Sequence, residues 1–265
     1  MTGREKNMKA VFISDAHLKR STDQRYGQFI QFLADLQEGK VKSLVDAKEL
    51  GREKTSIDDL YILGDFFDFW FCNKDHIHPE FQLVISKLME LQKTGVRIHL
   101  CEGNHDFFMK EYFHDVLGME VFEEWATIKL DKLQMLVSHG DTADRSDRIY
   151  MMFRKILRSR PFYHIQRFIP ASVRWALAGI TSNASKQMND DKSDFLVEKM
   201  LSFATGKLRE DYDAVILGHC HKPVLRYFDV NGKKKTFATL GDWIRHYSFL
   251  YYENRKFFMS YYPPR

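Results

Sequence analysis

The chain has 265 residues, of which 44% are hydrophobic and 14% aromatic, and its formal net charge is +4. This length and hydrophobic content are enough for a sizeable core, in one large domain or in one domain with an insert. The net charge is modest for a chain of this length. Three cysteines, Cys72, Cys101 and Cys220, are unpaired by spacing, which excludes a disulfide framework and favours a reducing compartment.

The N-terminal segment, residues 1–8, is short, polar and charged. It lacks the apolar core of a signal peptide. No stretch of the chain approaches the ~20 apolar residues of a membrane span. We therefore expect a cytoplasmic protein, or one that associates with a membrane surface from that side.

Short apolar runs alternate with amphipathic segments along the chain. The runs predict strands over 10–13, 60–63, 96–101, 135–137 and 214–217. Helical spacing of apolar residues predicts helices over 26–36, 81–91, 107–117 and 195–203, while 38–59 reads as a polar surface loop with room for one helical turn. Residues 121–137 predict two strands joined at Asp131-Lys132. Alternating residues predict four strands near the end, over 224–230, 235–240, 248–252 and 257–262, with Asn231-Gly232 as a hairpin turn.

Five of the apolar runs end in a turn that carries Asp, Asn or His. The turns are Ser14-Asp15-Ala16-His17, Gly64-Asp65, Gly103-Asn104-His105-Asp106, His139-Gly140-Asp141 and Gly218-His219-Cys220-His221. Loops at the carboxyl ends of strands in an open α/β sheet are the usual place for a ligand site. A single Asp there is an ordinary helix N-cap, and a lone His is an ordinary loop or core residue. Five such turns together favour a site for two adjacent metal ions, and the oxygen and imidazole donors suit Mn, Fe or Zn.

The five blocks D-x-H, G-D, G-N-H-D, H-G-D and G-H-x-H, in this order, resemble the motifs of the calcineurin-like metallophosphoesterase family and span most of the chain. The resemblance implies an α/β fold of two packed mixed β-sheets flanked by helices. It implies two divalent ions, most simply Mn²⁺. One ion would be held by Asp15, His17, Asp65 and His221, and the other by Asp65, Asn104, His139 and His219. We expect Asp65, Asn104 and His105 to carry catalysis, with His105 as an acid or charge stabiliser near the leaving group.

The segment 148–192 lies between two of these motifs and carries nine Lys or Arg against two acidic residues. Apolar residues at helical spacing predict three short helices, over 149–157, 162–169 and 173–180, the last two following Pro161 and Pro170. Basic amphipathic helices with Trp and Phe are typical of membrane-surface elements. A plain solvated cap and a nucleic-acid surface are the alternatives, and the apolar faces disfavour nucleic acid. We predict a helical lid inserted in a single domain, 1–265, that contacts the inner face of the cytoplasmic membrane.

The lid resembles that of the family members that hydrolyse the pyrophosphate of UDP-2,3-diacylglucosamine in the lipid A pathway. The resemblance rests on Asp147-Arg148-Ile149-Tyr150, Ile169-Pro170, Val173-Arg174 and Ser185-x3-Asn189-x2-Lys192, with Thr239–Trp243 as a similar closing region. It implies substrate contacts from Asn104, His105, Asp147, Tyr150, Ser185, Asn189, Lys192 and His219, and UMP as a product. Many members have Arg where this chain has His105, and an expected Arg is Ser182 here.

Two other functions remain open from the sequence. A phosphodiesterase or phosphatase of the same superfamily could act on another substrate, such as a cyclic nucleotide. A noncatalytic scaffold could keep the fold for protein binding, although the full set of ligands and His105 argue against it. The aromatic run 66–71 is either a substrate-facing wall or packing beneath the site. No obligate protein partner and no nucleic-acid partner is predicted.

Overall fold

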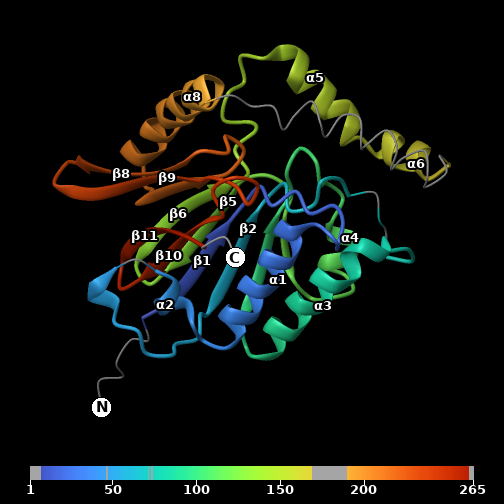
Figure 1. Cartoon of the computed structure of the whole chain (residues 1–265). Helices are drawn as coiled ribbons and strands as arrows, with labels where there is room; N and C mark the ends of the chain where they lie inside the picture. Colours follow the sequence, from blue (N-terminus) through green and yellow to red (C-terminus); the bar gives the residue numbers. More distant parts are fainter. Residues whose placement is uncertain (1–6, 46, 71, 73, 169–189, 263–265) are drawn as a thin grey trace.

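Two mixed β-sheets form the centre of the protein (Figure 1). The structure, a computed structural model, describes residues 7–262 apart from 46, 71, 73 and 169–189. The first sheet has the order β11-β10-β1-β2-β3-β4. Its strands are β1 Lys9–Ile13, β2 Asp59–Leu63, β3 Arg97–Cys101, β4 Glu120–Phe122, β10 Ser248–Glu253 and β11 Lys256–Tyr261. The second sheet has the order β5-β6-β7-β9-β8. Its strands are β5 Ala126–Leu130, β6 Leu133–Ser138, β7 Ala214–Leu217, β8 Pro223–Val230 and β9 Lys233–Leu240.

In the first sheet β10 runs against the other strands, whereas in the second sheet both outer strands run against a parallel centre. β1, β2, β3 and β4 pair in parallel, and so do β6, β7 and β9. β10 is antiparallel to β1, while β5 and β8 are antiparallel to their neighbours. The carboxyl ends of β1, β2 and β3 therefore meet at one edge of the first sheet, and those of β6 and β7 meet at one edge of the second.

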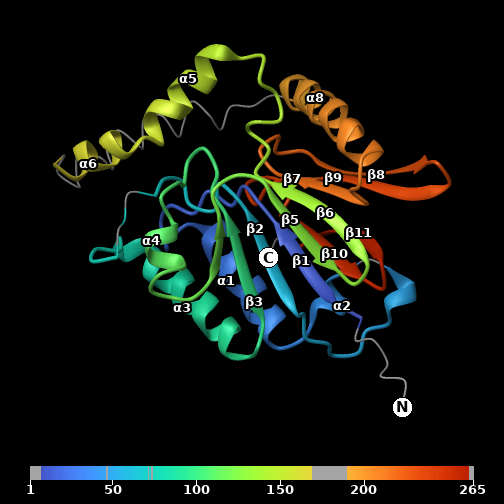
Figure 2. The same cartoon turned by 180° about the vertical axis from the view of Figure 1, so that it is seen from behind.

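The two sheets pack face to face because alternate residues of each strand point to opposite sides. Phe12 and Leu63 of the first sheet share a buried cluster with Val137 and Ile216 of the second. Val11 and Ile62, their neighbours in sequence, belong instead to the cluster under α1 Gln24–Gln37 and α3 Pro79–Lys93. Figure 2 shows these helices on the outer side of the first sheet. Both faces of β1 and β2 are thus buried, which explains their continuous apolar runs.

α8, Asp190–Arg209, covers the outer face of the second sheet. It extends beyond the predicted helix over 195–203 at both ends, and at the C-terminal end Ala204 and Leu208 continue the buried stripe of Val197 and Met200. Cys220 lies in the same cluster as a buried free thiol, as expected for a packed cysteine.

Most predicted elements are confirmed, including the two strands joined at Asp131-Lys132, but an additional edge strand was missed and one helix is shorter than predicted. The segment 121–137 contains parts of three strands, because the short edge strand β4 pairs with β3 in the other sheet before β5 and β6 form their hairpin. The helix expected over 107–117 is one turn, α4 Lys110–Phe113, followed by turns up to Gly118. The loop 38–59 contains α2 Val41–Leu44 and a 3₁₀ turn, Lys48–Leu50.

The first two helices of the basic segment are present as α5 Arg148–Leu157 and α6 Arg160–Phe168. In Figures 1 and 2 they run above the sheets as an arm. The third predicted helix, over 173–180, lies outside the described residues. None of the described helices is both long and apolar enough to cross a membrane.

Candidate metal centre

The five predicted turns meet at the edge where the parallel strands end. The turn after β1 is bound to the turn after β2, since Asp15 and His17 donate their backbone N–H groups to the carbonyls of Gly64 and Asp65 at 3.1 and 2.9 Å. His139, after β6, reaches across to the first sheet with Nδ1 3.0 Å from the carbonyl oxygen of Leu63. Parallel strand order therefore brings together side chains that are about 200 residues apart in sequence.

Several of these turn residues have a backbone conformation that L-residues avoid. Asp15, His17, Asp65, His219 and His221 have φ values of 54°, 44°, 49°, 66° and 55°. Such conformations cost of order 1–3 kcal/mol each and cluster at functional sites. Their concentration at one edge of the sheets indicates a functional site that requires these side-chain directions despite the strain.

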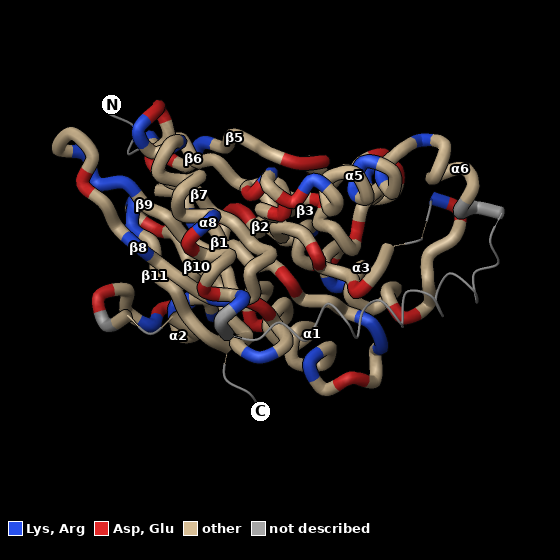
Figure 3. Tube along the Cα trace, turned by 90° about the horizontal axis from the view of Figure 1, so that it is seen from above, with Lys and Arg blue, Asp and Glu red and all other residues tan. Residues whose placement is uncertain are grey.

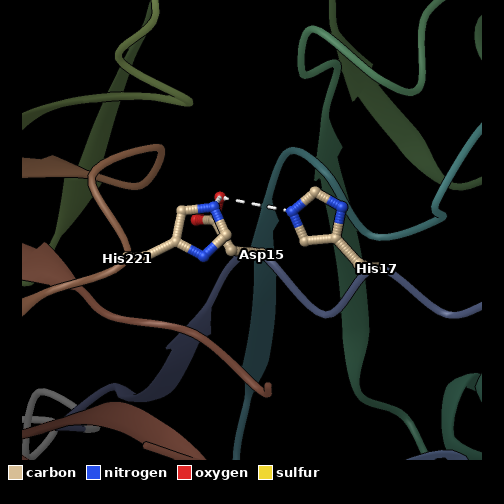
Figure 4. Close-up of side chains that lie close together, drawn as sticks. All are labelled: Asp15, His17 and His221. Atoms are coloured by element: carbon tan, nitrogen blue, oxygen red, sulfur yellow. Dashed lines mark ion pairs between the residues drawn. The ribbon is translucent and has the colours of Figure 1, made fainter. Parts of the chain in front are cut away.

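The first group of side chains contains Asp15, His17 and His221, shown in Figure 4. His221 Nε2 and His17 Nε2 lie 3.4 and 3.9 Å from Asp15 Oδ1. Asp15 Oδ1 is buried and accepts no hydrogen bond from the described residues. Two imidazole nitrogens and a carboxylate oxygen therefore converge on one point, which fits a divalent cation of the first transition row.

The second group contains Asp65, Asn104, His139 and His219. His139 Nε2 lies 3.0 Å from Asn104 Oδ1, 3.2 Å from His219 Nδ1 and 3.5 Å from Asp65 Oδ2. When His139 is neutral, as metal binding requires, it donates from Nδ1 to Leu63 and presents a lone pair at Nε2. Lone pairs that face one another repel unless a cation lies between them, so these residues also fit a metal.

Asp65 belongs to both groups. Its Oδ2 lies 3.6 Å from His17 Nε2 and 3.5 Å from His139 Nε2. Gly103 makes room for it, because a Cβ at that position would be 2.2 Å from Asp65 Oδ1. One carboxylate oxygen between two sets of donors is the arrangement that two adjacent cations would share.

The electrostatics of the pocket also favour positive charge. Burial raises the pKa of Asp65, but the positive charges of His139, His105 and His17 outweigh it and hold that pKa well below its usual range. Burial lowers the pKa of His139, yet the charges of Asp65 and Asp15 raise it to about 9. The protein without metal thus keeps a proton among these carboxylates, in the region where the donor atoms would hold a cation.

Comparisons with known proteins agree with this geometry. The profile of the calcineurin-like phosphoesterase family matches residues 8–223. The chain belongs to this family. Two curated relatives, from Proteus mirabilis and Stutzerimonas stutzeri, are both named UDP-2,3-diacylglucosamine hydrolase. They are 26% and 29% identical to this chain, over 89% of it and 91% of each relative. Among solved structures, a protein of unknown function from Aquifex aeolicus aligns with 85% of this chain and 83% of its own, with 17% identity and a TM-score of 0.32.

The family match and the curated relatives named as hydrolases together indicate a hydrolytic enzyme, which argues against the scaffold interpretation. Its clustered Asp and His side chains form a divalent-metal-binding centre. All seven residues predicted as metal ligands lie at this edge, together with His105. Their individual roles, and the identity of the metal, belong to the proposal below.

His105 is oriented by two contacts. Its Nδ1 lies 2.9 Å from the carbonyl oxygen of Asp68, and Phe69 lies against the ring with centroids 4.8 Å apart. Its Nε2 is 4.0 Å from Asp65 Oδ2, so the ring edge faces the centre. The aromatic run divides accordingly: the side chains of Phe66, Phe67 and Trp70 are buried in the core, as in the packing interpretation, and the ring of Phe69 packs against the ring of His105.

Two buried carboxylates outside the predicted set hold this phosphoesterase centre in shape. Asp106 accepts backbone N–H groups from Asp65, Phe66, Phe67 and Gly103 at 2.6–3.1 Å. Asp242 Oδ1 accepts three more, from residues 244–246, and its Oδ2 lies 3.3 Å from His221 Nδ1. Both residues stand in motifs that the sequence displayed, G-N-H-D and Leu240-Gly241-Asp242-Trp243, but the ligands that they support, Asp65 and His221, lie elsewhere in the chain.

The residues predicted to contact the substrate are less closely clustered than the predicted metal ligands. Asp147 caps α5, with Oδ1 2.8 Å from the backbone nitrogen of Tyr150, and the Tyr150 hydroxyl donates to Asp141 at 2.8 Å. Lys192 is exposed on α8. Ser185 and Asn189 lie outside the described residues.

Asp242→Asn tests the support of His221. The amide keeps one oxygen for the backbone N–H groups but removes the negative charge beside the imidazole, so metal affinity should fall about 10–100-fold. Isothermal titration with Mn²⁺ measures this. Asp229→Asn on the β8–β9 hairpin, where Asp229 accepts the Gly232 N–H at 2.9 Å, is the matched control and should bind normally. Unchanged affinity in the Asp242 variant would refute its role.

Proposed function

We propose that the chain hydrolyses the pyrophosphate of UDP-2,3-diacylglucosamine to UMP and 2,3-diacylglucosamine 1-phosphate. The carrying observation is that Asp65 Oδ2 lies 3.6 Å from His17 Nε2 and 3.5 Å from His139 Nε2, which supports a site in which one carboxylate serves two metal ions. Asp15, His17, Asp65 and His221 would hold one ion, and Asp65, Asn104, His139 and His219 the other. Mn²⁺ is the simplest choice for these donors, and Fe or Zn is compatible with them. The names of the curated relatives support the substrate.

Divalent ions in this site would lower the pKa of bound water to about 7 and neutralise phosphate charge. The chain's own residues define where the phosphate can lie. Asp65 fixes the separation of the two donor groups, and Asn104 adds an amide oxygen to the second. His105 Nε2 faces the same centre with its ring held by Asp68 and Phe69, so it can place a hydrogen bond or a positive charge on a phosphate oxygen.

In this reaction the leaving group is a phosphate monoester, which needs little protonation. His105 would therefore act chiefly as an electrostatic clamp rather than as a general acid. That role explains why Arg can stand at this position in other family members. This chain has His105 where many of those members have Arg. That difference leaves a second candidate substrate class, another nucleotide or lipid-linked phosphate.

The lipid part of the substrate fits the outer surface of α5. Ile149, Met152, Phe153 and Ile156 are 71%, 56%, 58% and 52% exposed, and Ile165 of α6 is 60% exposed. Figure 3 shows Lys and Arg along the same arm. Exposed apolar side chains flanked by basic ones are typical of helices that lie in a membrane interface. We infer that α5 and α6 form a lid that contacts the inner face of the cytoplasmic membrane, where a lipid-linked nucleotide sugar would be taken up.

The reaction is tested by incubating the protein with UDP-2,3-diacylglucosamine and Mn²⁺ and measuring UMP. Asp65→Asn should lower the amount of bound metal and reduce turnover by more than about 100-fold. Loss of a residue that only hydrogen-bonds to a metal ligand costs up to about 100-fold, and loss of a shared ligand should cost more. Hydrolysis of small diesters without release of UMP from the lipid substrate would favour the second substrate class. Near-normal turnover of the variant at saturating Mn²⁺ would contradict a shared Asp65.

Vesicle binding tests the membrane contact. Co-sedimentation with anionic vesicles should fall as salt rises, because each Lys or Arg near such a surface contributes about 1 kcal/mol that ions screen. Phe153→Ser together with Ile156→Ser should weaken binding, whereas Leu83→Ser, at a 46% exposed position on α3, should not. Absence of binding at low salt would count against the membrane role.

His105→Arg separates the clamp from the general acid. Arginine stays charged and can only stabilise, whereas histidine can exchange a proton near neutral pH. The clamp predicts that His105→Arg retains much of the turnover of the lipid substrate and that His105→Ala loses it. General acid catalysis contributes ~10²–10⁴-fold, so an Arg variant as inactive as the Ala variant, with metals bound, would identify an acid instead.

A further inference from the structure

α5 is attached to the rest of the molecule by polar side chains. Tyr150, Arg154 and Arg158 follow at four-residue spacing and share one face of the helix. The Arg154 and Arg158 side chains are 9% and 13% exposed. The apolar residues Ile149 and Phe153 on the other side are 71% and 58% exposed. α5 is therefore an inverted amphipathic helix whose charged face binds the protein.

Arg154 contacts the loop that follows β6. Its Nε donates to Asp141 Oδ2 at 2.6 Å, and the Tyr150 hydroxyl donates to the same oxygen at 2.8 Å. Its Nη1 donates to Glu124 at 2.6 Å. Asp141 is buried and stands two residues after His139. The contact therefore reaches the loop that supplies an imidazole to the second donor group.

Arg158 contacts the loop that follows β3. Its Nη2 donates to the carbonyl oxygen of Gly103 at 2.7 Å, and its Nη1 donates to Glu102 Oε2 at 3.1 Å and to the carbonyl oxygen of Glu123 at 2.9 Å. Gly103 immediately precedes Asn104 and is in contact with Asp65, since a Cβ there would lie 2.2 Å from Asp65 Oδ1. A shift of the Gly103 carbonyl would thus displace Asn104 or press on Asp65.

The buried side chain of Glu102 also depends on its contact with Arg158. It is buried, and its Oε1 accepts the Met109 N–H at 2.8 Å. A buried carboxylate needs a partner, and Arg158 supplies it from α5.

We propose that Arg154 and Arg158 are positioning residues of the hydrolytic centre. From α5 they hold the loops that carry His139 and Asn104, so the centre is fully assembled only while α5 is seated. The inference rests on the proposed function to the extent that this centre hydrolyses phosphate esters. It does not depend on the identity of the lipid substrate.

Arg154→Lys and Arg158→Lys keep the positive charge but lose the fork that joins two acceptors. With saturating Mn²⁺ and bis(p-nitrophenyl) phosphate, kcat should fall about 10–100-fold and Mn²⁺ affinity by a similar factor, while KM changes by less than about twofold. Arg148→Lys is the matched control, because Arg148 is exposed at the start of the same helix, and it should retain all three values.

The double variant Glu102→Gln with Arg158→Met separates positioning from folding, because it removes both members of a buried charge pair. It should unfold near the wild-type midpoint and still lose kcat and Mn²⁺ affinity, since the Gly103 carbonyl is no longer held. Wild-type kcat and Mn²⁺ affinity in the two lysine variants would overturn the proposal. Failure of the proposed function would differ, as the wild-type protein itself would release no UMP from the lipid substrate.

Discussion

The buried carboxylate of Asp65 is the group on which the rest of the site depends. It has almost no contact with solvent and lies among three imidazoles, those of His17, His105 and His139. A buried charge of this kind is stable only with compensating positive charge close by. The surrounding structure holds Asp65 Oδ2 at nearly equal distances from the two groups of nitrogen and oxygen donors.

Rigidity around Asp65 comes from backbone contacts rather than from side-chain packing alone. Asp106 binds the N–H groups on both sides of the site, and the Asp65 carboxylate itself accepts the His105 N–H at Oδ1 at 2.9 Å. The left-handed conformations of Asp65 and its neighbouring ligands require this support, because each costs free energy that the two-sheet core must supply. The strands themselves are buried on both faces, which makes them a stable base for strained loops.

The ligand set was accessible from the sequence because each ligand follows an apolar run that ends in a turn, and both features are local. The supporting carboxylates were not. Asp242 contacts His221 only because β9 and β7 are neighbours in the sheet, and no local pattern carries that information. The same limit explains why β4 was not separated from the hairpin of β5 and β6, since strand pairing is a long-range contact. Periodicity also located the faces of α5 correctly, but it cannot tell which face turns toward the protein.

The inversion of α5 would connect the proposed membrane contact to the chemistry of the metal centre. A helix that buried its apolar face would be held by packing and would leave no apolar surface exposed for contact with a lipid. By using Arg154 and Arg158 for attachment, the chain leaves Ile149, Met152, Phe153 and Ile156 at the surface. The attachment points are directional hydrogen bonds to the two loops beside the donor groups, and such bonds are lost over a small displacement, unlike apolar contacts. A force on the outer face of α5 would therefore act on the loops that hold Asn104 and His139.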